Sequence, residues 1–357
     1  MSADVLLVGS IPYDTNEEVF REFGPAFGSA LIAMPDGEVG PRSHWISRVH
    51  YAVFANHPDL ETVRQPKKDN GVERLNPRDA GDSWQFRVRD GVDTVAFGDK
   101  GWRLGYARDA INSYFIFKAL RAEGLYPAST RFQVSVPSVN SAVPYRIFTD
   151  QNDVEKVRGG YVEALKAELE TIIQHIPHHD LAIQLDCASE VQDAYGAIAG
   201  QPMATAIDRN TPQITALLSW IPHEVMVGFH MCFGTLGGWP RFEPDDISGA
   251  VRMANAFLHA ADRPVAWMHI PLLARPEEAF YAPLRGLEPR GARIFLGIVH
   301  SMDSYRERLK IAKKFVADFG VAAYCGFGRM NPSELPDIRQ QHLDALHLLH
   351  AAGDRNA

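Results

Sequence analysis

Cysteine, basic charge and long apolar runs are all scarce in this sequence. The 357-residue chain has three cysteines, an odd number, and they lie far apart, so we expect a reducing, cytosolic compartment rather than a disulfide framework. A formal net charge of −8 argues against a nucleic-acid partner, which would require a basic face. No apolar run reaches the length of a membrane span, and no basic segment of a secretory signal precedes the first apolar stretch.

A dinucleotide-binding fingerprint is also missing. A doubly wound open sheet of that class would carry Gly-x-Gly-x-x-Gly after its first strand, and Val8-Gly9-Ser10-Ile11-Pro12 does not supply it. The hydrophobic content of 46% is nevertheless ample for a core. The length fits either two ordinary domains or one large α/β barrel.

Eight short apolar runs recur along the chain, and helical patterns lie between them. The predicted strands are 4–10, 30–34, 131–136, 181–185, 225–229, 264–267, 293–299 and 321–324. Strands that alternate with helices imply a parallel sheet, and eight such units imply a closed barrel. We therefore predict an α/β protein with a single (β/α)8 TIM barrel over residues 1–357, with a doubly wound open sheet as the alternative.

The stretch 58–106 breaks this alternation. It contains turn chemistry in place of helical periodicity. Within it, residues 83–97 alternate between apolar and polar on both sides of Asp90-Gly91, a dipeptide that favours a tight turn. We predict a β-hairpin there, inserted after the second β/α unit and beside the main core.

Metal-type ligands follow the ends of several predicted strands. His230 and Cys232 come directly after strand 225–229, and residues two apart in an extended chain point to the same side. Cys325 follows the last strand. Because the carboxyl ends of barrel strands meet at one face, and Zn²⁺ prefers nitrogen and sulfur ligands, the sequence predicts a zinc site there.

The fourth zinc ligand is open at this stage. His269 lies at the end of the neighbouring strand and is the first choice, followed by His300 and Cys187. A closed shell of four protein ligands is typical of a structural zinc site. Catalysis would therefore require either a ligand that leaves or only three protein ligands.

Other polar and aromatic residues at the strand ends are candidates for substrate contacts. Glu38 follows a Pro-Asp-Gly turn and could bind an ammonium group or act as a base, or it could be an ordinary loop acid. Asp186 ends an apolar strand, where an unpaired carboxylate would be costly, so it needs a polar partner. Ser10 could bind a carboxylate, and Trp239 could stack on a flat substrate. His300 is an alternative catalytic base.

Four motifs, in this order along the chain, resemble the catalytic barrel of cobalamin-independent methionine synthase. They are Gly9-Ser10-Ile11-Pro12, Ile183-Gln184-Leu185-Asp186, His230-Met231-Cys232 and Tyr324-Cys325-Gly326. Together they are typical of the superfamily that also contains uroporphyrinogen decarboxylase-like barrels.

The resemblance implies that zinc activates a small-molecule thiol, which then attacks a methyl or other alkyl donor. It implies further that Ser10 and Asp186 hold the amino-acid part of the thiol, with Glu38 contacting its amine. Two positions depart from the family pattern, since His269 stands where the family has a zinc-binding glutamate, and Cys187 replaces an acidic residue. The chain also has the length of one barrel only. We therefore expect a zinc-dependent alkyltransferase that is not methionine synthase itself.

Two other functions fit the same residues. One is a zinc-dependent hydrolase or lyase that acts on a small organic substrate through metal-bound water, with Glu38 or His300 as the base. The other is a non-catalytic zinc-binding or thiol-binding protein in which the metal is structural.

Overall fold

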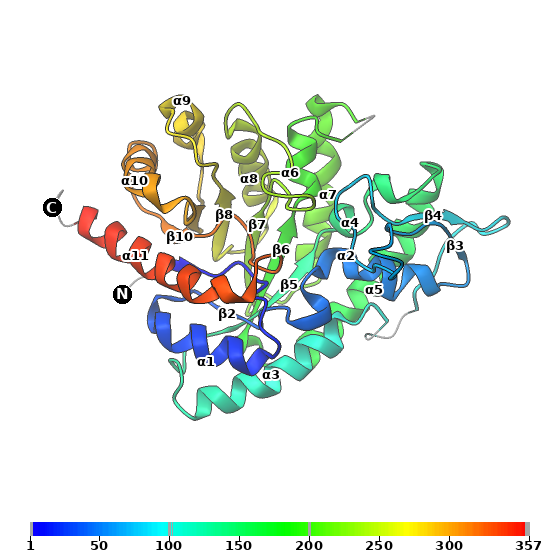
Figure 1. Ribbon diagram of the computed structural model, residues 1–357, viewed down its shortest axis with the longest axis horizontal. Helices are drawn as coiled ribbons and strands as arrows, with labels where there is room; N and C mark the ends of the chain where they lie inside the picture. The colour runs from blue at the N-terminus through cyan, green and yellow to red at the C-terminus, as the bar shows by residue number, and fades with distance from the viewer. Residues whose placement is uncertain (1–2, 99–100, 102, 199–200, 354–357) are drawn as a thin grey trace.

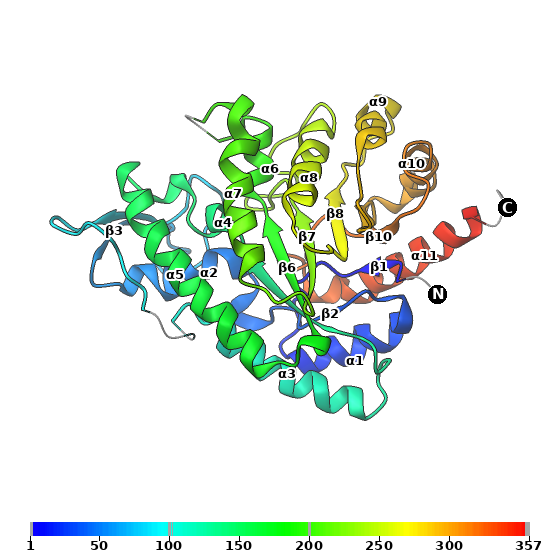
Figure 2. The same cartoon turned by 180° about the vertical axis from the view of Figure 1, so that it is seen from behind.

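The computed structural model describes residues 3–98, 101, 103–198 and 201–353. Its main feature is an eight-stranded sheet in which every pair of hydrogen-bonded neighbours is parallel, and which curls around a central axis (Figures 1 and 2). Along the sheet the order is β1-β10-β9-β8-β7-β6-β5-β2. The strands are β1 (Val5–Leu6), β2 (Met34–Pro35), β5 (Phe132–Pro137), β6 (Leu181–Cys187), β7 (Met226–Met231), β8 (Trp267–Pro271), β9 (Arg293–Gly297) and β10 (Gly320–Ala322).

The two edges of this sheet meet between β1 and the segment that leads into β2. A parallel bridge joins Val5 to Leu31, the Asp4 backbone N–H donates to the Ala30 carbonyl at 2.9 Å, and the Ile32 N–H donates to the Val5 carbonyl at 3.2 Å. The strands therefore follow one another around the ring in chain order. The predicted (β/α)8 barrel is confirmed.

Helices surround the strands. They are α1 (Asn16–Phe27), α2 (Trp45–Ala52), α3 (Tyr106–Ala122), α4 (Val139–Ala142), α5 (Asn152–His175), α6 (Ser189–Ala194), α7 (Ala206–Ser219), α8 (Ser248–Ala260), α9 (Glu278–Tyr281), α10 (Tyr305–Lys313) and α11 (Leu335–Gly353). A Thr15–Glu18 capping box starts α1, as the sequence pattern favours. The unit after β8 has only the short α9. Within the described residues, no helix combines the length and the apolar character that a membrane span requires.

Side-chain alternation along the strands divides the core in two. One set of strand residues faces outward and packs with the helices in a large apolar cluster. The opposite set fills the barrel interior, where the fully buried Trp267 meets Phe295, Leu6 and Ala182. This packing forms a solid floor beneath the loops at the carboxyl ends of the strands.

The segment between α2 and α3 contains a two-stranded antiparallel sheet of β3 (Leu60–Arg64) and β4 (Gln85–Val88), at the periphery of the molecule beside α5 (Figures 1 and 2). The predicted hairpin around Asp90-Gly91 is wrong in its pairing, because β4 pairs with the earlier β3. The residues after the turn contact α5 instead, and the Val95 N–H donates to the Lys156 carbonyl at 3.0 Å. Their alternating apolar side chains face a helix and not a second strand.

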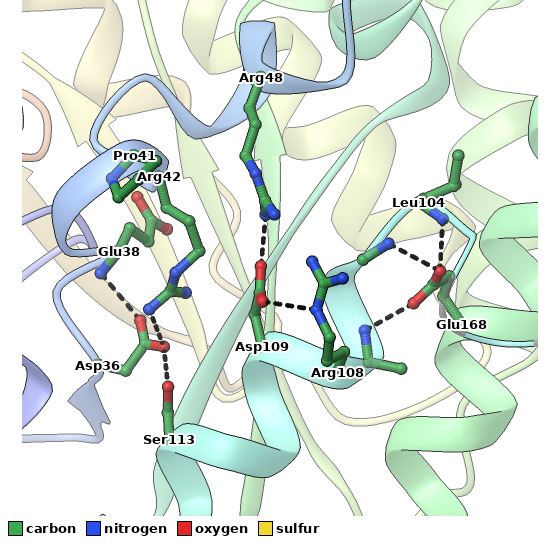
Figure 3. Close-up of polar contacts among 12 residues, drawn as sticks. Asp36, Glu38, Pro41, Arg42, Arg48, Leu104, Arg108, Asp109, Ser113 and Glu168 are labelled. Atoms are coloured by element: carbon green, nitrogen blue, oxygen red, sulfur yellow. Dashed lines mark hydrogen bonds and ion pairs between the residues drawn. The ribbon is translucent and has the colours of Figure 1, made fainter. Parts of the chain in front are cut away.

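The end of this segment is fixed by Glu168 of α5. Its carboxylate accepts hydrogen bonds from the backbone N–H groups of Leu104 at 2.7 Å, Gly105 at 3.0 Å and Ala107 at 2.6 Å (Figure 3). A carboxylate at this place satisfies donors that the first turn of α3 leaves free, and it favours the positive end of the helix dipole. The insertion therefore returns to the barrel at a defined position.

Candidate metal centre

The ends of β7 and β10 bring His230, Cys232 and Cys325 together. Their ligand atoms all lie within 4.8 Å of one another. Cys325 Sγ lies 3.6 Å from Cys232 Sγ and 3.7 Å from His230 Nε2. A tetrahedral zinc ion with ordinary Zn–S and Zn–N bonds separates its ligand atoms by about 3.5 to 3.8 Å. The two distances from Cys325 therefore match those of a zinc site, and the three predicted residues have its donor types.

His269 is not part of this group, but it contacts the side of the His230 ring that faces away from the cysteines. Its Nε2 is 2.9 Å from the Ala323 carbonyl and its Nδ1 is 2.8 Å from His230 Nδ1. Because a carbonyl only accepts, His269 Nε2 carries a proton, and burial lowers the pKa of His269 well below its usual value. The neutral ring then accepts at Nδ1 from the His230 Nδ1–H, which leaves Nε2 as the His230 nitrogen that faces Cys325 and that could bind a metal.

The two cysteines share their charge unequally. The S–H of Cys232 points to Cys325, and this hydrogen bond, together with His230, lowers the pKa of the Cys325 thiol well below its usual range although burial opposes the shift. The same hydrogen bond, followed by burial, raises the pKa of Cys232 well above its usual value. The pair thus holds one negative charge beside an imidazole, an environment that attracts a cation.

A cavity of about 930 Å³, open to solvent, lies over the three ligands. Ser10, Glu38 and Asp186, which were predicted to contact substrate, also line it. Cys187 lines the same cavity, but its thiol points to the Leu185 carbonyl, with Sγ 3.8 Å from the oxygen. It is not part of the metal group. The barrel mouth therefore places the candidate metal ligands and three candidate substrate residues around one space.

Glu38 reaches the cavity through an unusual turn. Gly37 and Glu38 both have positive φ, 80° and 48°, and for a glutamate this left-handed conformation is uncommon. Asp36 holds the turn, since its Oδ1 accepts from the Glu38 N–H at 2.9 Å while Oδ2 binds Arg42 at 2.8 Å and Ser113 Oγ at 2.6 Å (Figure 3). The role of Asp36 was not predicted, although an Asp two residues before a turn N–H is the signal for it.

The two carboxyl groups of the cavity are poorly solvated. Burial, and then the neighbouring Asp186, raise the pKa of Glu38 well above its usual value, while the Ser10 hydroxyl donates to its carboxylate and opposes the shift. Burial also raises the pKa of Asp186 to about 7, against the effects of His230 and of Gln184, whose Nε2 donates to Oδ1 at 2.8 Å. Both acids therefore respond to the charge of whatever occupies the cavity.

Val8 lines the same cavity in a strained conformation. Its φ of 60° is rare for a β-branched residue. The Val8 carbonyl accepts from two buried amides, Gln133 Nε2 and Gln184 Nε2, the latter at 2.8 Å. These contacts hold the turn that presents Ser10, and periodicity alone gave no signal of them.

Two predicted site residues are not among those that line the cavity in the described part of the chain. His300 directs Nε2 to the Leu272 carbonyl at 2.8 Å, and burial, and then Arg308, lower its pKa to about 4. Trp239 stacks on Tyr324 with ring centroids 4.2 Å apart. The His300 ring is thus engaged with a backbone carbonyl and the Trp239 ring with Tyr324, because closeness to a strand end does not fix where a side chain points.

Sequence reasoning also missed residues that do line the cavity. They come from helices and loops rather than from strand ends, and they include His44, His50 of α2, Arg146, Gln192 of α6, Arg241 and Arg329. Their positions depend on tertiary packing, for which no local pattern exists.

No protein-family model matches the sequence, and no curated protein matches it either. Among solved structures, a B12-independent methionine synthase from Shewanella sp. W3-18-1, in complex with selenomethionine, matches with a TM-score of 0.61 and 10% identity, over 99% of this chain and 98% of that chain. A methyltransferase from Methanosarcina mazei gives a TM-score of 0.48 and 12% identity, over 97% and 94%. The first likeness shows that this chain has the fold of a methionine synthase barrel, as the four motifs implied.

Proposed function

We propose that this protein is a zinc-dependent transferase that moves a methyl or other alkyl group to a small-molecule thiol. The observation that carries the proposal is the group of His230, Cys232 and Cys325, whose ligand atoms lie within 4.8 Å of one another at the floor of an open cavity. Zinc held there would keep a substrate thiol deprotonated and nucleophilic at neutral pH. The other steps depend on residues of the chain itself.

The donor set supports this choice of metal. Two sulfurs and one imidazole nitrogen suit zinc, and three protein ligands leave one position of a tetrahedron for the substrate, as in catalytic zinc sites. His269 keeps His230 in the tautomer that a metal requires. His269, which stands where the family has a zinc-binding glutamate, therefore contacts a ligand and is not itself one. The proposed ligand set consequently lacks the carboxylate that the family has.

Ser10, Glu38 and Asp186 are proposed to bind the polar part of the thiol. Burial raises the pKa of both acids, so they hold their protons more tightly than usual. An ammonium group beside them would favour their charged forms and would be bound by them. The selenomethionine in the solved methionine synthase structure supports an amino acid as this polar part.

Neither alternative function has an equally specific basis. Hydrolase or lyase chemistry requires a base near the metal, and His300 lies off the cavity, which leaves Glu38. A purely structural zinc site would be closed by four protein ligands, whereas the three residues here border a cavity.

The metal assignment is tested by zinc content. We expect about one zinc per chain in the wild type, and near-complete loss in Cys232→Ser and Cys325→Ser, because each removes a thiolate ligand. Cys187→Ser is the matched control, since this third cysteine lines the cavity without joining the group. Inductively coupled plasma mass spectrometry measures the zinc content of the purified variants. Full retention of zinc by both Cys232→Ser and Cys325→Ser would contradict the assignment.

The transferase assignment is tested by zinc-edge X-ray absorption during titration with amino-acid thiols such as homocysteine and cysteine. We expect one additional sulfur neighbour of zinc at saturation, and alkylation of that thiol by a methyl donor. An unchanged zinc shell with every thiol, together with a changed shell on adding small ketones or esters, would favour the hydrolase or lyase function instead.

A further inference from the structure

Three arginines line the cavity above the metal group without a carboxylate partner in the described part of the chain. They are Arg146, Arg241 and Arg329. Elsewhere in the same region arginines are paired in the ordinary way, as Arg209 is with Asp193 at 2.6 Å. A guanidinium removed from water is costly unless it meets a counter-charge. Arg329 is exposed to solvent, whereas Arg146 and Arg241 are half-buried, so these two cations require an explanation.

Arg146 is the clearest case. It belongs to a short 3-10 turn, Tyr145–Ile147, and its Nε is buried with no hydrogen-bond partner. Burial, and then the positive charge of Arg241, lower the pKa of Arg146 to about 10. Burial, and further the charge of Arg146, hold the pKa of the neighbouring His50 at about 4. Arg146 is thus a desolvated cation whose surroundings contain other cationic or neutral groups.

Arg241 is held in place by uncharged contacts. Its Nη1 donates to Gln192 Oε1 at 2.7 Å, and its backbone N–H donates to the Gly234 carbonyl at 3.1 Å. The Gly234 N–H in turn lies 3.2 Å from Cys232 Sγ. The loop that carries a candidate metal ligand therefore also carries the second unpaired cation.

The two arginines stand where two cavities adjoin. A second cavity of about 1230 Å³ shares Arg146, Gln192 and Arg241 with the first. Its own acids are already engaged, Glu155 by Arg158 at 3.1 Å and Asp193 by Arg209. The junction therefore has two guanidinium groups without a carboxylate partner, and none of the described residues that both cavities share is an acid.

We propose that Arg146 and Arg241 form a binding subsite for the carboxylate or phosphate group of a substrate. Planar guanidinium groups bind both kinds of anion through paired N–H bonds, and a ligand of this kind would supply the counter-charge that the protein lacks. This inference deepens the proposed function, on which it rests only for the identity of the ligand as a substrate. The substrate, thiol or alkyl donor, is then an organic anion whose reactive end extends to the metal group.

The test is calorimetric titration of the zinc-loaded wild type with inorganic phosphate and, separately, with acetate. We expect saturable binding of at least one anion, weakened at least tenfold in Arg146→Gln and in Arg241→Gln, and weakened by added sodium chloride. Arg209→Gln is the matched control, because this arginine of the second cavity has its own carboxylate, and it should bind as the wild type does. The preferred anion distinguishes a phosphate-bearing from a carboxylate-bearing substrate.

Thermal unfolding provides a second readout. The anion should raise the melting temperature of the wild type and leave that of both cavity variants unchanged, since only a ligand that binds the native state stabilises it. Cys232→Ser, free of metal, should still bind the anion, so loss of zinc and loss of the anion site are measured separately. The inference would be overturned if the wild type showed no saturable binding, or if Arg146→Gln and Arg241→Gln both bound the anion with the affinity of the wild type.

Discussion

At the residue scale, His269 determines which nitrogen His230 offers to a metal. The register of β7 and β8 places the two histidines directly opposite each other, and both are buried. The two rings therefore contact each other through their Nδ1 atoms, and His269 Nε2–H donates a hydrogen bond to the Ala323 carbonyl. A hydrogen bond of this kind raises the basicity of a ligand and fixes its orientation.

We therefore expect His269→Ala to weaken zinc binding by about 10- to 100-fold, as is usual when such a supporting partner is lost. The measurement is competition with a chromophoric chelator. His300→Ala is the control, a histidine of the neighbouring loop that lies off the cavity, and it should keep the wild-type affinity. Affinity that is unchanged in His269→Ala would contradict the role given to this ring.

The candidate ligands could be predicted from sequence because of a simple rule. Parallel strands end at one edge, so His230, Cys232 and Cys325 had to lie at the same face of the barrel once the eight units were recognised. The rule gives the face but not the direction of each side chain. It could not tell whether His269 is a ligand or a hydrogen-bond partner of a ligand. It also could not find Arg146, which lies in the 3-10 turn Tyr145–Ile147.

At the scale of single elements, the insertion shows tertiary packing overriding a local turn signal. Asp90-Gly91 does form a turn, and Gly91 has a φ of 80°. The residues after it nevertheless pack on α5, where an available helix face replaced the expected second strand. A two-residue turn motif predicts the bend of the chain and leaves the partner of the next segment undetermined.

Gly160 of α5 makes this packing possible and gives a direct test of it. A Cβ there would lie 1.8 Å from the Val95 carbonyl oxygen. Since the contact is with backbone, Gly160→Ala should lower the free energy of unfolding by about 3 kcal/mol, at the upper end for overpacking. The exposed neighbour Gly159, with open space around its Cβ position, is the control, and Gly159→Ala should stabilise by about 0.5 to 1 kcal/mol.

Urea unfolding followed by circular dichroism measures both variants. Equal effects of the two substitutions would show that α5 does not depend on the close approach of residues 91–97. A loss confined to Gly160→Ala would support the packing described here.

At the scale of the whole molecule, the stability should fall in acid because several histidines are buried in neutral form. His342 of α11 is an example outside the site. It is 1% exposed, its Nδ1 donates to the Ile338 carbonyl at 2.8 Å, and burial lowers its pKa to about 4. Between that value and the usual pKa near 6.5, the unfolded chain binds a proton that the native protein excludes.

The contribution of neutral His342 to the free energy of unfolding is thus fully present above about pH 6.5. It is lost as the pH falls toward 4, which lowers the free energy of unfolding by about 3 kcal/mol. Urea unfolding at pH 7 and pH 4, on metal-free protein, should show a smaller loss in His342→Leu than in the wild type. His347→Leu, an exposed change on the same helix, should follow the wild type. Parallel pH curves for all three proteins would argue against the burial effect.

The barrel itself could be predicted because eight alternations of strand and helix admit few other arrangements. The lengths of the strands could not. The first two are only two residues long, β1 (Val5–Leu6) and β2 (Met34–Pro35), because the chain leaves the ladder early to form the loops of the cavity. Apolar residues continue past the last ladder hydrogen bond, so hydrophobicity overestimates these strands.

The pairing of β1 with β10 also has a consequence for biosynthesis. Val5 lies opposite Val321, so β1 finds one of its two neighbours only after the much later β10 has been made. Cys325 is made just after that neighbour. A chain that stops before β10 therefore has neither a closed ring nor Cys325, and it lacks one of the three residues of the candidate metal group.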